Sequence, residues 1–293
     1  MAGDELSQRI ENALRRALAR VTGAAAPPRL AAACEASVFP AGQRIRPRLA
    51  LSVALACGDD RPLVANAAAV AVELLHCASL VHDDMPCFDD AALRRGRPSV
   101  HAAHGEALAL LAGDALIVLA FETVALAAAA DPLRAASLSL VIARAVGMPN
   151  GIVAGQGWES EPDPDLGLYQ RAKTGALFAG AAQAGAVAAG AAAADAWGLL
   201  GYRLGEAYQV ADDIRDVMCS ERTIGKPVGR DEALGRPNAV RELGLRGAAL
   251  RLKSLVEEAT DGVPVCPGAD ALKTQIRLQA SRFLPEDATQ YAA

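Results

Sequence analysis

The chain has 293 residues, of which 52% are apolar and only 4% are aromatic. Its formal net charge of −5 provides no basic surface, which argues against nucleic acid as a partner. Alanine and leucine are abundant, whereas runs of β-branched and aromatic residues are scarce, so the composition disfavours a β protein and predicts an all-α fold.

Apolar segments of helical length follow one another along the chain, and Gly or Pro separates many of them. Their approximate ranges are 5–22, 28–38, 45–57, 62–82, 105–128, 132–146, 168–190, 195–218, 238–260 and 267–282. No composition shift marks a linker and no internal repeat is visible, so a single domain over residues 1–293 is predicted. The small-residue stretch 181–194 is expected to pack closely against neighbouring helices.

The segment 106–130 is apolar enough to resemble a membrane span, but Asp114 and Glu122 interrupt it. We therefore expect a buried helix and no stable membrane insertion. Residues 1–20 form a charged amphipathic pattern without the apolar core of a signal peptide. The six cysteines contain no CxxC pair and suit reduced thiols, so the protein is expected to be cytoplasmic.

A cluster of acidic residues closes the fourth predicted helix. Asp83 and Asp84 stand at its end, and Asp89 follows in a loop that a proline favours. Arg94 and Arg95 come next, and their planar guanidinium groups match the geometry of phosphate oxygens. In isolation this pattern could also be an acidic loop with a compensating basic patch.

A second acidic cluster lies in the predicted helix 195–218. Asp212 and Asp216 are four residues apart and share one helix face, Asp213 is one position round, and Gln209 lies one turn before Asp213. Like charges at this spacing repel one another, and ionised carboxylates among apolar residues are costly to bury. A solvated acidic helix end is the alternative, but the segment just upstream is mostly apolar. The two clusters together predict one site where carboxylates hold Mg²⁺ and the cations hold phosphates.

Five motifs occur in order between about residues 40 and 240. They are GQRIRP (42–47), ELLHCASLVHDDMPCFDDAALRRG (73–96), AKTGALF (172–178), GEAYQVADDIRD (205–216) and GKPVGRD (225–231). With these motifs the chain resembles the short-chain trans-isoprenyl (polyprenyl) diphosphate synthases. GQGWESE (155–161) and RPNAV (236–240) make it most similar to the bacterial geranylgeranyl diphosphate synthases of carotenoid and bacteriochlorophyll pathways. The resemblance implies the isoprenoid synthase fold, a helical bundle with a central pocket between two Asp-rich helices, and typically a homodimer.

The resemblance also implies a role for each matching residue. The implied Mg²⁺ ligands are Asp83, Asp84, Asp89, Asp212, Asp213 and Asp216. The implied ligands of the allylic diphosphate are Arg94, Lys173, Thr174, Gln209 and Lys226, and those of isopentenyl diphosphate are Arg46, His76 and Arg95, with Gln43 beside them. The residues expected to carry catalysis are Asp83, Asp84, Asp89, Arg94, Lys173, Asp212 and Lys226.

The implied reaction begins when the allylic diphosphate ionises, which requires neutralisation of the charge that builds up on the leaving group. The double bond of isopentenyl diphosphate then captures the allylic cation and a proton is lost. The departing diphosphate is the expected base, because no carboxylate in these motifs is spared from metal.

Two positions depart from the family pattern. Gln43 stands where the family usually has Lys, which should weaken binding of isopentenyl diphosphate unless a neighbour such as Arg44 compensates. Arg230 replaces the usual second lysine of a Gly/Pro-containing segment around Lys226, and it keeps the charge. The composition of that segment suits a flap that closes over diphosphate and excludes water.

The position five residues before the first aspartate is expected to set product length. Farnesyl-producing relatives tend to carry a large aromatic there as a floor, whereas this chain has Ala78 followed by Ser79. Four residues also separate Asp84 from Asp89, a pattern seen in bacterial and plant geranylgeranyl synthases. A C20 product is therefore favoured over C15, with farnesyl diphosphate synthase as the alternative.

Other functions remain as alternatives. A terpene cyclase would need a second metal motif of the type NDxxSxxxE, where this chain has DDIRD, and a head-to-head condensing enzyme would need different Asp motifs. A non-catalytic partner subunit of a prenyl synthase is suggested only by Gln43, and the intact Asp clusters argue against it.

Overall fold

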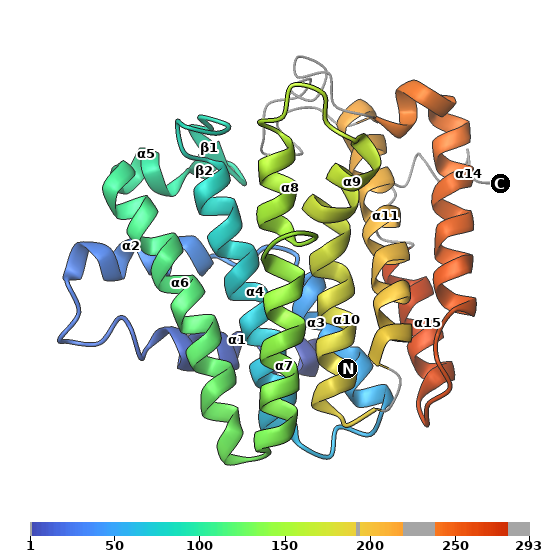
Figure 1. Cartoon of the computed structure of the whole chain (residues 1–293), viewed down its shortest axis with the longest axis horizontal. Helices are drawn as coiled ribbons and strands as arrows, with labels where there is room; N and C mark the ends of the chain where they lie inside the picture. Colours follow the sequence, from blue (N-terminus) through green and yellow to red (C-terminus); the bar gives the residue numbers. More distant parts are fainter. Residues whose placement is uncertain (1, 192–193, 219–237, 281–293) are drawn as a thin grey trace.

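The computed structural model describes residues 2–191, 194–218 and 238–280, and within these ranges the structure is almost entirely helical (Figure 1). The elements are α1 (Ala2–Leu18), α2 (Pro28–Val38), α3 (Ile45–Ala56), α4 (Pro62–Asp83), β1 (Leu93–Arg94), β2 (Arg97–Pro98), α5 (Val100–His104), α6 (Glu106–Leu126), the 3₁₀ turn η1 (Ala127–Ala129), α7 (Pro132–Val146), α8 (Ile152–Trp158), α9 (Leu166–Gln170), the π-helical turn η2 (Arg171–Gly175), α10 (Ala176–Ala188), α11 (Ala194–Met218), α14 (Ala239–Asp261) and α15 (Ala269–Ala280). The predicted all-α fold is confirmed.

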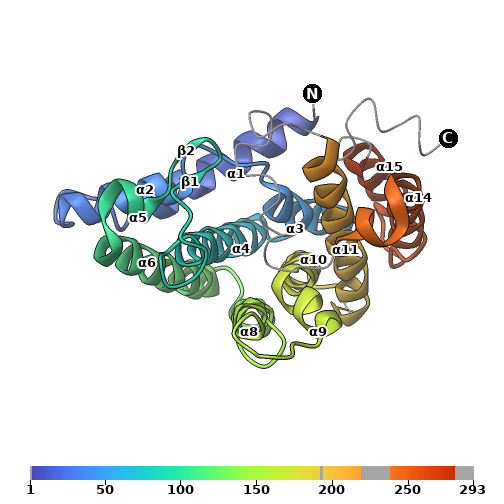
Figure 2. The ribbon, with the colours of Figure 1, turned by 90° about the horizontal axis from the view of Figure 1, so that it is seen from above.

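Helix α4 is the central element of the bundle. Figure 2 shows it between α6 on one side and α3 and α10 on the other. Its side chains are buried around almost the whole circumference, as expected for a helix that is apolar on every face. Pro62 occupies the first turn, where its missing N–H costs nothing, and the helix ends at Asp83, one residue beyond the predicted boundary. Because α4 is held in the apolar core, the first acidic cluster has a fixed position at the end of this helix.

Helices α3, α10 and α11 approach one another closely because small residues line their contacts. A Cβ at Gly185 would overlap the backbone of Ala50 in α3, and a Cβ at Gly201 would overlap the backbone of Phe178. Nearly every residue of α10 is buried. The close packing expected for the small-residue stretch is thus confirmed over its helical part, and it holds α11, which carries the second acidic cluster, against the bundle.

Helix α6 departs from the expectation of a buried helix. Only 39% of its most apolar window is buried, against 78% for α4, and both helices are long and apolar enough to cross a membrane by length and composition. Leu110, Leu111, Val118 and Leu126 are each about half exposed or more. The sequence alone could not separate these two helices because both are apolar all round, so only the packing of neighbours distinguishes them.

Two short helices were not predicted, and one predicted helix is divided. Helices α5 and α8 are short elements that lie outside the predicted helical ranges. The predicted helix 168–190 consists of α9, η2 and α10 in succession. Gly155 of α8 lies directly against the backbone of Lys173 in η2, where a Cβ would collide. This close approach brings α8 to the edge of the site described below.

Candidate active site

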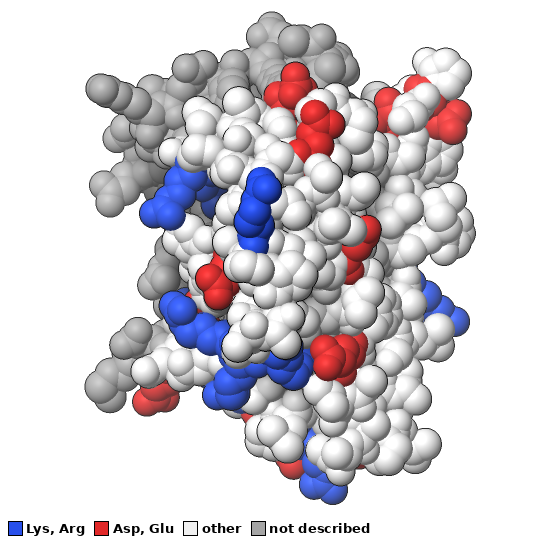
Figure 3. All heavy atoms as spheres, turned by 90° about the vertical axis from the view of Figure 1, so that its left-hand side faces the viewer, with Lys and Arg blue, Asp and Glu red and all other residues white. Residues whose placement is uncertain are grey.

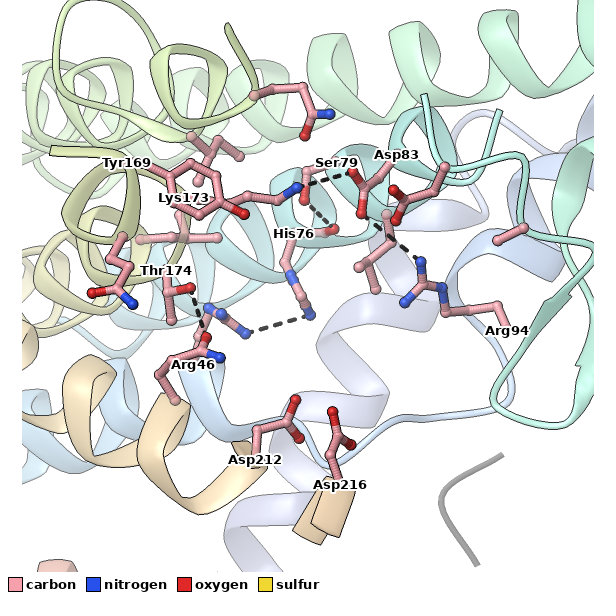
Figure 4. Close-up of a pocket in the computed structure, with 18 of the residues that line it drawn as sticks. Arg46, His76, Ser79, Asp83, Arg94, Tyr169, Lys173, Thr174, Asp212 and Asp216 are labelled. Atoms are coloured by element: carbon pink, nitrogen blue, oxygen red, sulfur yellow. Dashed lines mark hydrogen bonds and ion pairs between the residues drawn. The ribbon is translucent and has the colours of Figure 1, made fainter. Parts of the chain in front are cut away.

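A cavity of about 290 Å³ opens between the end of α4 and α11. Figure 4 shows Asp212 and Asp216 on α11 facing Asp83 and Arg94 across the open space, with Arg46 and His76 between them. The lining also includes Ser79, Leu80, Asp89, Ile152, Tyr169, Lys173, Thr174, Leu177 and Gln209. The two acidic clusters, far apart in the sequence, therefore meet at one cavity as predicted.

In the first cluster, Asp83 and Asp89 line the cavity, whereas Asp84 does not. Both oxygens of the Asp84 carboxylate accept hydrogen bonds from the Arg94 guanidinium, at 2.9 and 3.1 Å from its Nε, and the Asp84 side chain is 3% exposed. Asp84, which is predicted to be a metal ligand, is here bound to Arg94 and holds that guanidinium in place. Burial raises the pKa of Asp83, and the nearby Asp89 charge raises it further, against the lowering effect of Lys173. A neighbouring cation would therefore stabilise the ionised form of the Asp83 carboxylate.

In the second cluster, Asp212 and Asp216 line the cavity, whereas Asp213 points away from it. The Oδ1 atom of Asp213 accepts a hydrogen bond from Gln209 at 3.0 Å, and its Oδ2 accepts one from the backbone N–H of Ala239 at 2.7 Å. Asp213 therefore joins α11 to the first turn of α14, where helix N–H groups favour a carboxylate. The predicted metal contact of Asp213 is not supported by this geometry.

The π-helical turn η2 carries a second cation that contacts the first cluster, Lys173. Lys173 lies 2.5 Å from Glu159 and 3.3 Å from Asp83, and the side chain of Thr174 donates to Gln209 at 3.2 Å. Such π-helical turns are frequent at functional sites. Lys173, Thr174 and Gln209 are therefore brought together as predicted, although they come from two different helices.

Glu159 and Tyr169 were missed by the sequence analysis. Glu159 accepts hydrogen bonds from Lys173 and, at 2.7 Å, from the hydroxyl of Tyr169. The sequence signal that could have identified Glu159 is its position in the segment GQGWESE, which the comparison of motifs already included. This pair fixes the Lys173 ammonium at the edge of the cavity.

A second cavity, of about 530 Å³, adjoins the first and shares Arg46, His76, Leu80, Arg94 and Asp212 with it. It is lined in addition by Gln43, Arg95, Tyr208 and Arg215. The guanidinium of Arg46 lies 4.4 Å from the centre of the Phe178 ring. Burial lowers the pKa of His76, and the charges of Arg46 and other neighbouring arginines lower it further, so its imidazole is neutral at pH 7. A neutral His76 can accept from Arg46, whose Nη1 lies 3.4 Å from Nε2.

A tight hairpin places Arg94 and Arg95, which follow the first acidic cluster, at the two cavities. Strands β1 and β2 pair antiparallel, and Arg95 and Gly96 form the two-residue turn between them. Both turn residues have positive φ, at 54° and 72°, as the favoured hairpin turns of this length require. The Arg95 guanidinium lies directly on Gly42, where a Cβ would overlap it. Because Gly42 of GQRIRP has no side chain, Arg95 from a distant motif can pack against its backbone.

The geometry of two facing acidic pairs beside a cationic cavity agrees with the comparison to known proteins. The chain matches the sequence profile of the polyprenyl synthetase family over residues 27–263. It belongs to the polyprenyl synthetase family. The resemblance seen in the motifs is therefore confirmed.

Relatives within this family are similar along almost the whole chain. The geranylgeranyl diphosphate synthase of Cereibacter sphaeroides is 57% identical over 278 residues, which cover 95% of this chain and 96% of that protein. The geranylgeranyl diphosphate synthase of Rhodobacter capsulatus is 50% identical over 279 residues, with 95% and 96% covered. A crystal structure of a geranyltransferase from Helicobacter pylori, complexed with magnesium and isoprenyl diphosphate, matches with a TM-score of 0.81 at 27% identity and covers 95% of this chain and 97% of that one.

Three expectations for this polyprenyl synthetase concern residues beside the site. Arg44 cannot compensate for Gln43 as proposed, because its guanidinium is bound by Glu11 at 2.9 Å and by Glu73 at 2.6 Å. Ser79 lines the first cavity, whereas Ala78 is 1% exposed in the core and is not part of the lining. Lys226 lies outside the described residues.

Proposed function

We propose that this protein is a trans-prenyltransferase that condenses isopentenyl diphosphate with an allylic diphosphate and produces geranylgeranyl diphosphate. The observation that carries the proposal is the pair of facing acidic clusters at a cavity that shares Arg46, His76 and Arg94 with a second, cationic cavity. Two relatives that carry the name geranylgeranyl diphosphate synthase, at 57% and 50% identity, support the product.

The donors at the first cavity fit Mg²⁺. Asp83 and Asp89 on one wall and Asp212 and Asp216 on the other supply carboxylate oxygens, the ligands that this hard cation prefers. Across the described residues, no three His, Cys, Asp or Glu side chains come together closely enough to form a metal site by themselves. That spacing suits ions held jointly by protein carboxylates and substrate phosphates, as is usual for Mg²⁺. When bound, Mg²⁺ supplies neutralisation of the negative charge on the departing diphosphate.

The chain's own cations complete the binding of the allylic diphosphate. Lys173 and Arg94 stand at the wall that carries Asp83, and each is held there by a carboxylate partner, Glu159 or Asp84. Because these cations are already oriented, little reorganisation is needed when charge develops on the leaving group. Gln209 adds an amide from the opposite wall.

Isopentenyl diphosphate is assigned to the second cavity. Arg46, Arg95 and the neutral imidazole of His76 line it, and Arg46 and His76 also border the first cavity. The two substrates therefore bind side by side, so that the double bond of one reaches the allylic carbon of the other without a diffusional encounter. Leu80, Ile152 and Leu177 provide an apolar lining that favours the prenyl chain over water.

We also propose that the protein is a homodimer formed through α6 and α7. Exposed Leu110, Leu111, Val118 and Leu126 on α6 continue into exposed Leu133 and Leu140 on α7. Figure 3 shows wide uncharged areas on the side of the molecule that carries α6. An apolar surface of this kind is typical of an interface. Light scattering during size exclusion should give twice the mass of the chain, and Val118→Arg should shift the protein towards the monomer.

The function is tested by incubating the protein with Mg²⁺, isopentenyl diphosphate and each of dimethylallyl, geranyl and farnesyl diphosphate. A C20 product from these starters is expected. Products that stop at C15 would retain the mechanism but replace the product with farnesyl diphosphate. Folded protein without turnover on any starter would favour the non-catalytic partner subunit.

A further inference from the structure

Helix α11 presents one of its faces to the second cavity. Tyr208, Asp212 and Arg215 are spaced at i, i+4 and i+7, so they lie on the same side of the helix, and all three line that cavity. Asp212 also faces the first cavity and belongs to the predicted metal site. Arg215 has no role in the arrangement described so far, although its motif was quoted for its aspartates.

The contacts of Arg215 orient its guanidinium and leave some of its N–H groups available for a ligand. Its Nη2 donates to Asp212 at 2.9 Å, its Nε lies 3.4 Å from the carbonyl of Ala211, and its Cζ lies 5.6 Å from the centre of the Tyr208 ring. Among the described residues, none accepts a hydrogen bond from its Nη1. The side chain is 21% exposed, so it borders the open volume of the cavity. Arg215 can therefore reach an anion from a fixed position.

The carboxylates around the second cavity do not compensate all of its arginines, so the cavity can accommodate an anion. Arg44 is bound by Glu11 and Glu73, and Arg94 is bound by Asp84. Arg215 also has a carboxylate partner, Asp212, but its Nη1 keeps its N–H groups available to an anion.

Two further arginines at this cavity, Arg46 and Arg95, have no carboxylate partner among the described residues, and Gln43 carries no charge. Arg46 keeps a buried Nε that has no hydrogen-bond partner among the described residues. Arg95 lies on the backbone of Gly42, and Gln43 is neutral. A buried unpartnered N–H of a charged group is costly, and a phosphate oxygen is a ligand that would satisfy it.

We propose that Arg215 binds the diphosphate of isopentenyl diphosphate in the second cavity, from its position on α11, and supplies there the positive charge that Gln43 lacks. The proposal rests on the proposed function. It adds a substrate-binding residue from the second acidic motif to a site otherwise formed by the first two motifs. Arg215 can in addition stabilise the orientation of Asp212, so the test must separate binding of substrate from positioning of that carboxylate.

The test compares Arg215→Leu, Arg215→Lys and the double variant Gln43→Lys/Arg215→Leu with wild type. Arg203→Leu is the matched control, because Arg203 lies on the same helix and pairs with Glu206 and Glu258 at the surface. Steady-state kinetics give KM separately for isopentenyl diphosphate and for the allylic substrate, together with kcat and the Mg²⁺ concentration for half-maximal rate. Calorimetric titration with isopentenyl diphosphate measures binding without turnover.

We expect Arg215→Leu to raise KM and the dissociation constant for isopentenyl diphosphate by about 10- to 100-fold, the range of a charge-assisted hydrogen bond. The allylic KM and the Mg²⁺ requirement should stay near the wild-type values. Arg215→Lys should lose less, and Gln43→Lys should restore most of the affinity because it returns a cation to the same cavity. Arg203→Leu should behave as wild type.

Other results overturn the proposal. If Arg215→Leu leaves KM and affinity for isopentenyl diphosphate unchanged while wild type is active, Arg215 does not bind this substrate. If the variant instead alters the Mg²⁺ requirement and the allylic KM, and Gln43→Lys gives no rescue, Arg215 acts only by positioning Asp212. A wild-type protein without turnover contradicts the proposed function, and the calorimetric comparison then still decides the role of Arg215 in binding.

Discussion

The buried ion pair between Arg44 and Glu73 offers a stringent test of how the second cavity is held together. The Arg44 side chain is 5% exposed and that of Glu73 is 2% exposed, and their closest atoms are 2.6 Å apart. Arg44 also donates to the carbonyl of Val38 at 2.8 Å and to Glu11 at 2.9 Å. Burial alone would lower the pKa of Arg44, but the hydrogen bonds and charges of Glu11 and Glu73 outweigh it and raise that pKa. The guanidinium is therefore charged in the core.

Replacing Glu73 with Gln removes the charge that compensates Arg44 while keeping the shape of the side chain. Breaking a buried pair on one side typically costs about 3–5 kcal/mol. Because Glu11, whose side chain is 27% exposed, still binds the Nε atom, we expect a loss near the lower end, about 3 kcal/mol. At about 2–4 °C per kcal/mol for a chain of this size or slightly smaller, the melting temperature should fall by roughly 6–12 °C.

The assay is thermal unfolding followed by far-ultraviolet circular dichroism at one protein concentration, because association makes the melting temperature concentration-dependent. Glu257→Gln, at an exposed position on α14, is the control. The double variant Arg44→Met/Glu73→Leu should recover most of the loss, since removing both charges eliminates the uncompensated one. A melting temperature of Glu73→Gln within the spread of the control would refute the reasoning, as would a double variant that is less stable than the single one.

Three further variants test the site itself. Asp212→Asn should lower kcat by roughly 100-fold or more, because the loss of a metal-facing charge removes several kcal/mol of transition-state stabilisation. A near-normal kcat at saturating Mg²⁺ would contradict the place of Asp212 in the metal site. Ser79→Tyr, which adds an aromatic ring to the cavity lining, should shorten the product from C20 to C15 when the products are separated by chain length. An unchanged C20 product, with shortening by Ala78→Tyr instead, would place the limiting depth at Ala78. Gly42→Ala should displace the Arg95 guanidinium and raise KM for isopentenyl diphosphate by about 10-fold, the value of a charge-assisted hydrogen bond, with little change in the allylic KM; equal changes in both would contradict separate subsites.

Much of the fold could be predicted from local pattern. The expected ranges of α2, α3, α4, α7 and α11 lie within one residue of the observed bounds, because Gly and Pro punctuation and helical periodicity act over a few residues. The spacing of Asp212 and Asp216 also fixed their common helix face, and both line the cavity. Motif order alone was sufficient to indicate the family.

Roles that depend on distant partners could not be predicted in this way. Asp83 and Asp84 are neighbours in the sequence, yet one lines the cavity and the other is buried against Arg94. Likewise, Arg44 and Arg46 lie two residues apart, but only the packing of α1 and α4 directs Arg44 to Glu11 and Glu73. A carboxylate or guanidinium takes its role from the charge and solvent around it, and these are set by segments far away in the chain.

The sequence by itself therefore determined most of the long helices, which residue types gather in the motifs, and the chemistry that aspartates and arginines in that order can perform. Only the tertiary structure decided which members of each cluster face the substrates, that Glu159 holds Lys173, and that Arg215 borders the second cavity. The physical reason is the range of the forces involved. Helix formation depends on hydrogen bonds and side chains within a few residues, whereas burial and electrostatic pairing depend on atoms brought together by the fold.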